Sequence, residues 1–451
     1  MSSVNTPMQG MDDVFGAYLR KRQYVIRLLS NFVQRFGFQQ LEVPILERAS
    51  SFSEEIVGKS PWPEWDKRGC FYLTINNYAG SFGNIESQIE ALLIPEGTIS
   101  VTRWLGRLIQ DQGLRGLPLK IFYDIQCFRN ELVDKLSVIK RRQFRQFGLE
   151  ILGSSSIAAD MEIICMINEL LLLLGFPQES VVMRISDIRI FKQLVQESSL
   201  SYDDSLVIKE LMDSIAESRA GKNPHAVPSL KKRFWTHINH YGHLTIDCRK
   251  KWEYILDSSE MRISGETLTL FGEKYNQPFK DLNALTESMS AHGVNTKVDL
   301  CVVRSHEYYT GISFEIDIVG DSASFYEIAG GGRYDRLVSC FLSELDENFT
   351  IPSTGFAFGI ERVIEGATQF GLLSRFKRLE SFSHFDEASA DLLVIPPVRQ
   401  NMCEAYLEAW SQVKTTSPEK RHHIYVGANL SPEYLADFMD VYGITQKEML
   451  T

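Results

Sequence analysis

Two neighbouring segments, residues 127–131 and 142–150, carry charged and aromatic residues at a spacing that suits nucleotide binding. They flank a polar loop and read together as a hairpin. The guanidinium of Arg129 can bind a phosphate oxygen through two donors, and a carboxylate such as Glu131 can orient it. An aromatic ring on the returning strand, such as Phe144, can stack on a purine. The pattern predicts a nucleotide site; a solvent-exposed basic hairpin is the alternative.

A second group lies in residues 303–311, where Arg304, Tyr308 and Tyr309 precede a turn that ends at Gly311. Tyrosine hydroxyls bind polar ligands, and an arginine here could face a developing oxyanion. The pattern therefore favours a polar ligand site. Two ordinary strand tyrosines and a surface arginine remain the alternative.

Three further segments are less specific. Glycines at 330–332 would allow backbone to approach a ligand closely, or would form a hairpin turn. Residues 355–362 read as a strand that runs into a helix, where a helix N-terminus and an arginine favour phosphate. Glu96 and Thr98 could offer a carboxylate and a hydroxyl to an ammonium group, or could cap a helix that begins near Ser100.

The cysteines and histidines do not predict a metal site. No two of the seven cysteines stand at CxxC or CxxxC spacing, so neither a zinc site nor a disulfide framework is indicated. His237, His240 and His243 lack an acidic or cysteine partner at ligand spacing. Reduced thiols of this kind predict a cytoplasmic protein.

The elements that must position these residues are a mixture of helices and hairpin strands. Helical spacing of apolar residues predicts a helix over 12–36 that stops at Gly37. A strand is expected over 38–45, with Pro44 on a sheet edge or at a subunit boundary. Further strands are expected at 121–128, 143–152, 181–185, 298–303, 312–318 and 325–329, with a glycine-rich turn at 330–332. Because hairpins dominate, the fold class is α+β around a largely antiparallel sheet flanked by helices.

The chain divides into two expected domains. Residues 1–375 form the larger one, with a helix at 157–174 and a helix-rich insertion at about 190–292. A polar linker near 374–389 follows. Residues 388–451 then read as strand, helix, strand, helix, a small appended α/β unit.

Charge and hydropathy exclude some classes of protein. The 451 residues carry a net charge of -11, which argues against indiscriminate coating of nucleic acid but permits local basic patches at 140–145 and 249–251. The most apolar stretch, 161–176, is interrupted by Asn168 and Glu169 and is too short for a membrane span. No membrane partner is therefore expected.

Taken in order, the motifs resemble the class II aminoacyl-tRNA synthetases, and specifically the histidyl-tRNA synthetase family, over residues 9–370. Residues 10–13 with the helix and strand to Pro44 look like the dimer-forming first motif, 128–150 like the second, and 359–362 like the third. Residues 303–311 and 330–335 look like the two segments peculiar to the histidine enzymes. This last pair makes the resemblance specific.

The resemblance implies a role for each motif residue. The ATP-binding residues would be Arg129 on the α-phosphate, Phe144 on adenine, Arg362 on the γ-phosphate, and Glu131. The histidine-binding residues would be Glu96, Thr98 and Gln146 on the ammonium, Glu150 and Tyr308 on the two imidazole nitrogens, and Arg129, Arg304 and Tyr309. Arg304 would stabilise charge on the α-phosphate, so that Arg129, Arg304 and Gln146 form the catalytic set. Mg²⁺ would accompany ATP, with no tightly bound metal.

The implied activity is ATP-dependent activation of histidine and its transfer to a histidine-specific tRNA by a cytoplasmic homodimer. Three positions differ from the family pattern: Ile94 replaces arginine, residues 305–307 replace Gly-Leu-Asp, and Arg145 replaces histidine. The C-terminal unit is also shorter than the family's anticodon-binding domain. Two alternatives follow: a non-catalytic regulatory subunit of ATP phosphoribosyltransferase, and an adenylating paralogue that uses another amino acid or acceptor.

Overall fold

The structure is a computed structural model of the whole chain. It describes residues 6–14, 16–58, 68–78, 85–113, 115–130, 141–221, 223–257, 263–304, 307–320, 324–342, 349–372, 391–397, 401–415, 421–441, 444 and 446–450. Several features that the sequence singles out lie outside the described residues: Glu131, Lys140, residues 305–306 and the linker near 374–389.

An eight-stranded sheet forms the centre of the molecule, in the order β1-β5-β6-β11-β10-β9-β7-β8. Its strands are β1 (Gln39–Gln40), β5 (Leu119–Phe128), β6 (Gln143–Leu152), β7 (Val181–Asp187), β8 (Thr296–Val298), β9 (Ile312–Val319), β10 (Ser324–Arg333) and β11 (Ser353–Gly359). Only the outermost pairs, β1 with β5 and β7 with β8, are parallel. The expected α+β fold around a largely antiparallel sheet is thus confirmed.

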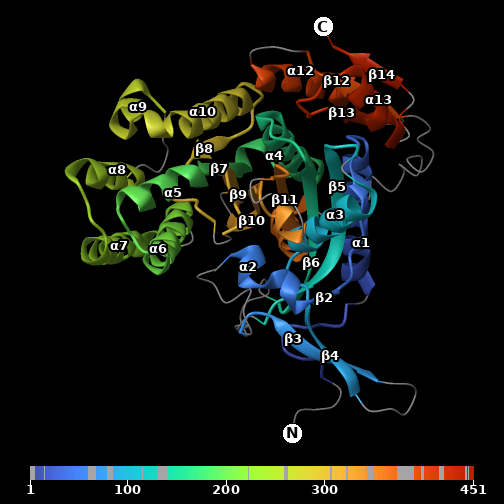
Figure 1. Cartoon of the computed structure of the whole chain (residues 1–451), viewed down its shortest axis with the longest axis horizontal. Coiled ribbons are helices and arrows are strands. Elements are labelled where there is room, and N and C mark those ends of the chain that lie inside the picture. Colours follow the sequence, from blue (N-terminus) through green and yellow to red (C-terminus); the bar gives the residue numbers. More distant parts are fainter. Residues whose placement is uncertain are drawn as a thin grey trace.

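Helices cover this sheet and pack with its strands into the hydrophobic core (Figure 1). They include α1 (Gly16–Gln34), α3 (Thr98–Gln112), α4 (Ile157–Leu173) and α11 (Ile360–Gln369). Helix α4 is buried along nearly its whole length, because it lies between the sheet and the C-terminal unit. Its apolar run therefore belongs to a core helix.

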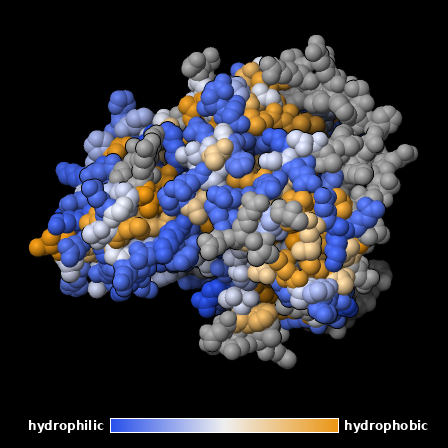
Figure 2. All heavy atoms as spheres, turned by 90° about the horizontal axis from the view of Figure 1, so that it is seen from above, coloured by the Kyte–Doolittle hydropathy of each residue, from blue (hydrophilic) through white to orange (hydrophobic). Residues whose placement is uncertain are grey.

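The insertion between β7 and β8 is helical in the part that is described. It comprises α5 (Ile188–Glu197), α6 (Tyr202–Ala220), α7 (Val227–Tyr241), α8 (Ile246–Asp257), α9 (Gly265–Phe271) and α10 (Asn276–Ala291). These helices stand to one side of the sheet, and the surface they expose is mostly hydrophilic (Figures 1 and 2). They bury their own aromatic residues, among them Phe234 and Trp252, whose rings lie 5.3 Å apart.

Two smaller sheets complete the described structure. One is β2 (Leu46–Arg48), β4 (Ile85–Leu93) and β3 (Phe71–Tyr78), which extends away from the main sheet as a long hairpin (Figure 1). The other is the parallel sheet β13-β12-β14 of the C-terminal unit, formed by β12 (Asp391–Ile395), β13 (Arg421–Ile424) and β14 (Gln446–Met449). Helices α12 (Met402–Thr415) and α13 (Pro432–Val441) pack with it.

The strand expected over 38–45 is much shorter than predicted. Gln39 and Gln40 pair with β5, the N–H of Leu41 donates to the carbonyl oxygen of Phe122 at 2.9 Å, and the chain then crosses to the small sheet at β2. Pro44 lies in the crossing between the two sheets, where its missing N–H costs no strand hydrogen bond.

The turn expected at 330–332 is also wrong, because these glycines lie inside β10 and pair with both β9 and β11. Neighbouring groups explain why glycine is needed within a strand. A Cβ at Gly331 would lie 2.1 Å from the carbonyl oxygen of Gly355, and one at Gly330 would lie 2.4 Å from the guanidinium of Arg304. The glycines make room for packing within the sheet.

Two other boundaries differ from the expectation. The strand expected over 298–303 ends at Val298, because Asp299 begins a tight turn and its carboxylate accepts a hydrogen bond from the N–H of Cys301 at 3.0 Å. The C-terminal unit does not stop after its second helix, since β14 follows and pairs with β12.

Candidate active site

Glu150, near the C-terminal end of β6, is fully buried, and hydroxyl groups surround its carboxylate. Thr98 Oγ1 donates to Oε1 at 2.9 Å and Tyr123 Oη donates to the same atom at 3.1 Å. The Tyr334 hydroxyl donates to Oε2. Thr98 begins α3, Tyr123 lies on β5, and Tyr334 directly follows β10, so the donors come from separate parts of the sequence.

Glycines make room for this cluster. A Cβ at Gly355 on β11, the cross-strand partner of Glu150, would lie 1.5 Å from Glu150 Oε2. A Cβ at Gly148, the cross-strand partner of Tyr123, would lie 2.3 Å from the Tyr123 ring. Larger residues at either position would displace the carboxylate or the ring, so the site depends on both glycines.

Burial sets the protonation state of this carboxylate. Desolvation raises the pKa of Glu150 to about 8, although hydrogen bonds from Tyr334, Thr98 and Tyr123 oppose the shift. The carboxyl group is therefore largely neutral at pH 7. A ligand that carries a proton or a positive charge to this site would stabilise the ionised form of the Glu150 carboxylate.

The first turn of α3 joins this cluster to Gln146. Glu96 caps the helix, since its carboxylate accepts hydrogen bonds from the N–H groups of Thr98 at 3.0 Å and Ile99 at 2.9 Å. The adjacent N–H of Gly97 donates to Gln146 Oε1 at 2.8 Å. Capping and substrate binding are therefore compatible roles here, because the cap places Thr98 against Glu150.

Arg129 and Phe144 lie together at the end of the β5–β6 hairpin. The Arg129 guanidinium carbon is 5.3 Å from the centre of the Phe144 ring, and Nε donates to the carbonyl oxygen of Pro95 at 3.0 Å. The hairpin predicted from the sequence thus brings a cation and an aromatic ring together. This geometry can hold an anionic group beside a flat ring.

Arg304 follows β8 in a strained conformation, with φ at 50°. Its Nη1 donates to Glu315 Oε1 on β9 at 2.9 Å, and Glu315 also pairs with Arg184 at 2.8 Å. The side chain keeps 20% exposure, so the guanidinium is fixed and still reachable. Such an arginine suits charge that develops on a bound ligand.

Three tyrosines form the other wall. The ring centres of Tyr308 and Tyr309 are 4.8 Å apart, and Tyr308 meets Tyr334 edge to face at 6.0 Å. All three are buried. Tyr334 therefore links the pair expected from the sequence to the Glu150 carboxylate.

Arg362 lies in the first turn of α11, directly after β11, at the strand-to-helix junction predicted from the sequence. Its Nη1 donates to the carbonyl oxygen of Glu327 at 2.8 Å, and Glu327 has a positive φ of 54°. The contact anchors Arg362 to β10. Its expected role on a γ-phosphate stays a prediction.

The sequence reasoning gave no role to Tyr123, Tyr334 or Glu315. One signal could have found Tyr123: it stands opposite Gly148 in the hairpin, and a glycine opposite an aromatic residue indicates that the ring lies across it. No comparable local signal exists for Glu315, because its partners come from β7 and from the segment after β8.

Three of the residues that depart from the family pattern, Ile94, Arg145 and Glu307, are described by the structure. Ile94 is fully buried and its N–H donates to Ile45 O at 2.9 Å. Arg145 donates to both carboxylate oxygens of Asp124 at 2.7 Å. Glu307 pairs with Lys209 of α6. These three residues thus have partners outside the contacts of Glu150.

Within the described residues, no group of three or more histidine, cysteine, aspartate or glutamate side chains is placed to hold a metal ion. In the same part of the chain, no helix is both long enough and apolar enough to cross a membrane.

Comparison with solved structures defines the class of fold. An ATP phosphoribosyltransferase regulatory subunit/histidyl-tRNA synthetase from Bacillus halodurans aligns over 100% of both chains with a TM-score of 0.58 and 17% identity. A histidyl-tRNA synthetase from Nostoc sp. PCC 7120 aligns over 98% of this chain and 90% of its own, with a TM-score of 0.58 and 19% identity. The fold is thus of the histidyl-tRNA synthetase type.

Sequence comparison places the chain within a family. Residues 93–363 match the family model of histidyl-tRNA synthetase. The histidine–tRNA ligase of Sulfolobus acidocaldarius is 30% identical over 79% of this chain and 73% of its own length. That of Thermosipho melanesiensis is 27% identical over 85% and 79%. The chain belongs to the histidyl-tRNA synthetase family, as its motifs predicted.

Proposed function

We propose that this protein is a histidine–tRNA ligase, which activates histidine with ATP and transfers it to tRNA. The observation that carries the proposal is Glu150, a buried carboxylate with hydroxyl donors around it and a pKa of about 8. Imidazole titrates near 6.5, so one proton can be shared between the two groups close to neutral pH. A pocket built on such a pair discriminates strongly against side chains that cannot hydrogen-bond to it.

The departures from the family pattern are compatible with histidine. Arg145 and Glu307 each form an ion pair on another element, and Ile94 is enclosed in the core. None of the three forms the Thr98, Tyr123 and Tyr334 contacts of Glu150. This argument favours histidine as the substrate over the different amino acid that an adenylating paralogue would use.

Activation proceeds by attack of the amino-acid carboxylate on the α-phosphorus of ATP, with pyrophosphate as the leaving group. Arg129 holds the α-phosphate and the carboxylate, Phe144 stacks on adenine, and Arg362 binds the γ-phosphate. Arg304 stabilises charge on the α-phosphate as the bond forms. Positioning and fixed cations can accelerate this reaction without covalent catalysis. Mg²⁺ enters as part of the ATP substrate.

Transfer follows when a terminal hydroxyl of tRNA attacks the carbonyl carbon of the adenylate and AMP leaves. Glu96, Thr98 and Gln146 bind the histidine ammonium, and Tyr308 with Tyr309 closes the pocket. Glu131 joins the ATP site. These roles rest on the family resemblance together with the placement of the described residues.

The active form is a homodimer in this proposal. Apolar side chains of the small β2-β4-β3 sheet support it, since Ile45 just before β2 is 46% exposed, Leu46 40% and Leu73 41%. A partner subunit would bury them beside the short edge strand β1. A monomer by light scattering at micromolar concentration would contradict the dimer.

Pyrophosphate exchange into ATP, measured with each amino acid in turn, tests the function. We expect exchange with histidine alone. Exchange with a different amino acid would identify an adenylating paralogue. No exchange with any amino acid would move the protein to the regulatory class.

A further inference from the structure

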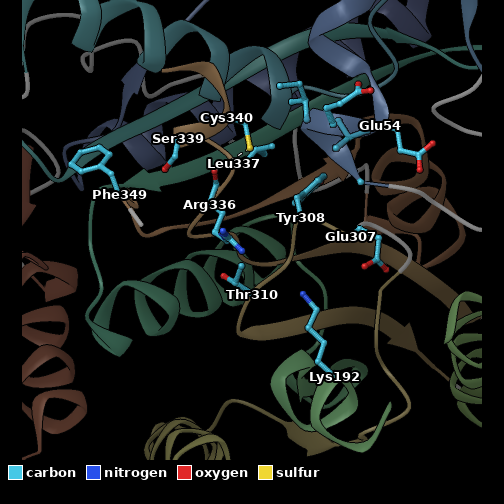
Figure 3. Close-up of a pocket in the computed structure, with 14 residues that line it drawn as sticks. Glu54, Lys192, Glu307, Tyr308, Thr310, Arg336, Leu337, Ser339, Cys340 and Phe349 are labelled. Carbon is cyan, nitrogen blue, oxygen red and sulfur yellow. Dashed lines mark hydrogen bonds between the residues drawn. The ribbon is translucent and has the colours of Figure 1, made fainter. Parts of the chain in front are cut away.

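A cavity of about 570 Å³ lies between α2 (Glu54–Val57), α5 and the segment 336–340 (Figure 3). Tyr308 and Thr310 form part of its wall, so the cavity shares the 307–310 turn with the site around Glu150. Its volume lies within the range of small-molecule sites and far exceeds that of a single ion. Among the residues given a role above, Tyr308 alone lines this cavity.

Two cations from separate elements point into this cavity. Lys192 of α5 and Arg336, just after β10, converge on Thr310 (Figure 3). Burial lowers the pKa of Lys192, and the charges of Lys209 and Arg336 lower it further, while Glu307 opposes them. Cations that face each other at a cavity wall indicate a site that lacks its anion.

The acidic residues of the lining do not cancel this charge. Glu307 is already paired with Lys209, whose side chain is only 2% exposed. Glu54 and Glu55 stand exposed on α2. Within the described residues, neither Lys192 nor Arg336 forms an ion pair with any of these three carboxylates.

Residues with hydroxyl side chains also line the cavity, namely Thr310 and Ser339. Apolar side chains complete the lining: Val57, Leu337 and Phe349.

We propose that this cavity binds a small organic molecule that carries a phosphate group. Arg336 and Lys192 contact the phosphate, and the organic part rests on the apolar wall. Arginine and lysine are the usual protein partners of phosphate. The ligand is not a substrate of the adenylation reaction, so the site goes beyond the proposed function.

Occupancy of the cavity should affect the amino-acid site through the turn they share. Lys192 Nζ donates to the carbonyl oxygen of Tyr309 at 2.8 Å, and Glu307 ties the start of this turn to α6. If the affinity of the cavity ligand for Lys192 changes when histidine binds, the affinity for histidine must change by the same factor when the cavity ligand binds.

Calorimetry on the full chain, without histidine or ATP, tests the site directly. The probes are ribose 5-phosphate and inorganic phosphate. We expect ribose 5-phosphate to bind more tightly, and Arg336→Gln and Lys192→Gln each to weaken it roughly 10-fold, as loss of a charge-assisted contact predicts. Arg107→Gln is the matched control, because Arg107 is a 76% exposed arginine on α3.

Three results would overturn the proposal. Binding of ribose 5-phosphate that survives Arg336→Gln but is lost in Arg362→Gln would place the phosphate in the nucleotide site. Equal affinity for inorganic phosphate would show that the organic part of the ligand is not recognised. No binding of either probe at millimolar concentration would show that the cavity is not a phosphate site. Because the assay contains no adenylation substrate, its outcome is separate from that of pyrophosphate exchange.

Discussion

Two fully buried glutamates, Glu150 and Glu162, sit in different parts of the protein and have different kinds of partner. Glu150 is surrounded by the hydroxyls of Thr98, Tyr123 and Tyr334. Glu162, on α4, pairs with the equally buried Lys120 at 2.7 Å. Burial raises both pKa values, to about 8 for Glu150 and to about 7 for Glu162, where the charge of Lys120 opposes the rise.

The difference separates a carboxylate whose partners are neutral hydroxyls from one that is paired with a cation. Lys120 and Glu150 lie on neighbouring strands but point to opposite faces, because Lys120 pairs with Ile151 and Glu150 with Ile121. Lys120 also donates to the carbonyl oxygen of Ile424 in the C-terminal unit. Its ion pair thus closes a contact between two parts of the chain, whereas Glu150 has hydroxyl partners that a ligand can complement.

Removing the cation of the Lys120–Glu162 pair should have the largest effect, and that effect should be on stability. Lys120→Met leaves Glu162 buried without its partner, and breaking a buried pair in this way costs roughly 3–5 kcal/mol. Urea unfolding should show this loss in the free energy of unfolding. The variant should also weaken docking of the C-terminal unit, where the rings of Phe36 and Trp410 stack at 4.6 Å.

The double variant Lys120→Met with Glu162→Met is the control for that experiment. Replacing both charges with apolar side chains removes the desolvation cost along with the attraction, so most of the lost stability should return. A double variant as unstable as the single one would show that the charges are not responsible.

Glu150→Gln should change substrate binding more than stability. An amide cannot supply the negative charge that a protonated imidazole needs, so the histidine KM should rise roughly 100-fold, as expected for a buried charge-assisted contact. The KM for ATP should change little. Steady-state pyrophosphate exchange measures both values.

Glu162→Gln is the matched control, since it makes the same chemical change in a carboxylate of equal burial. It should lower the free energy of unfolding and leave the histidine KM near that of the native protein. Equal effects of both variants on the histidine KM would remove the distinction between the two carboxylates.

The pH dependence of histidine binding should reveal the shared proton. Above pH 8 free Glu150 is ionised and must take up a proton with the ligand, so the histidine KM should rise by up to about 10-fold per pH unit. Below about 6.5 free histidine is protonated and a proton must leave, so the KM should rise again. Exchange measured from pH 6 to 9 should therefore show the lowest KM between these limits.

Folding should titrate with the same group. The folded pKa of Glu150 lies above its ordinary value of 4.5, so this group's contribution to stability is complete below pH 4.5. It is then lost as the pH rises through 8.

A histidine KM that stays flat from pH 7 to 9 would contradict a proton shared with Glu150.

Much of the fold follows from local sequence signals. Strand β6 runs from Gln143 to Leu152 as predicted, and α4 begins at Ile157 as expected. The failures occur where a distant group decides the local structure. The glycines of β10 read as a turn because nothing near them in the sequence indicates that the Arg304 side chain and the carbonyl oxygen of Gly355 occupy the space beside them.

The site divides in the same way. Arg129 and Phe144 were predictable because one hairpin carries both, and the contact between them follows from its geometry. The partners of Glu150 were not, because Thr98 and Tyr334 reach it from elements 52 and 184 residues away. Sequence motifs can supply the residue types, but only the tertiary fold determines which hydroxyl meets which oxygen.

Tyr334→Phe gives the finest test of how the hydroxyls tune Glu150. The variant removes the hydrogen bond that does most to lower the pKa of this carboxyl group, ahead of those from Thr98 and Tyr123. The upper limb of the KM profile should therefore move to higher pH, and the histidine KM at pH 7 should rise by roughly 5-fold, as for one lost hydrogen bond. Tyr123→Phe is the matched control, with the same change at a contact that lowers the pKa less. A larger shift for Tyr123→Phe than for Tyr334→Phe would mean that Oε1, which Tyr123 shares with Thr98, governs the proton instead.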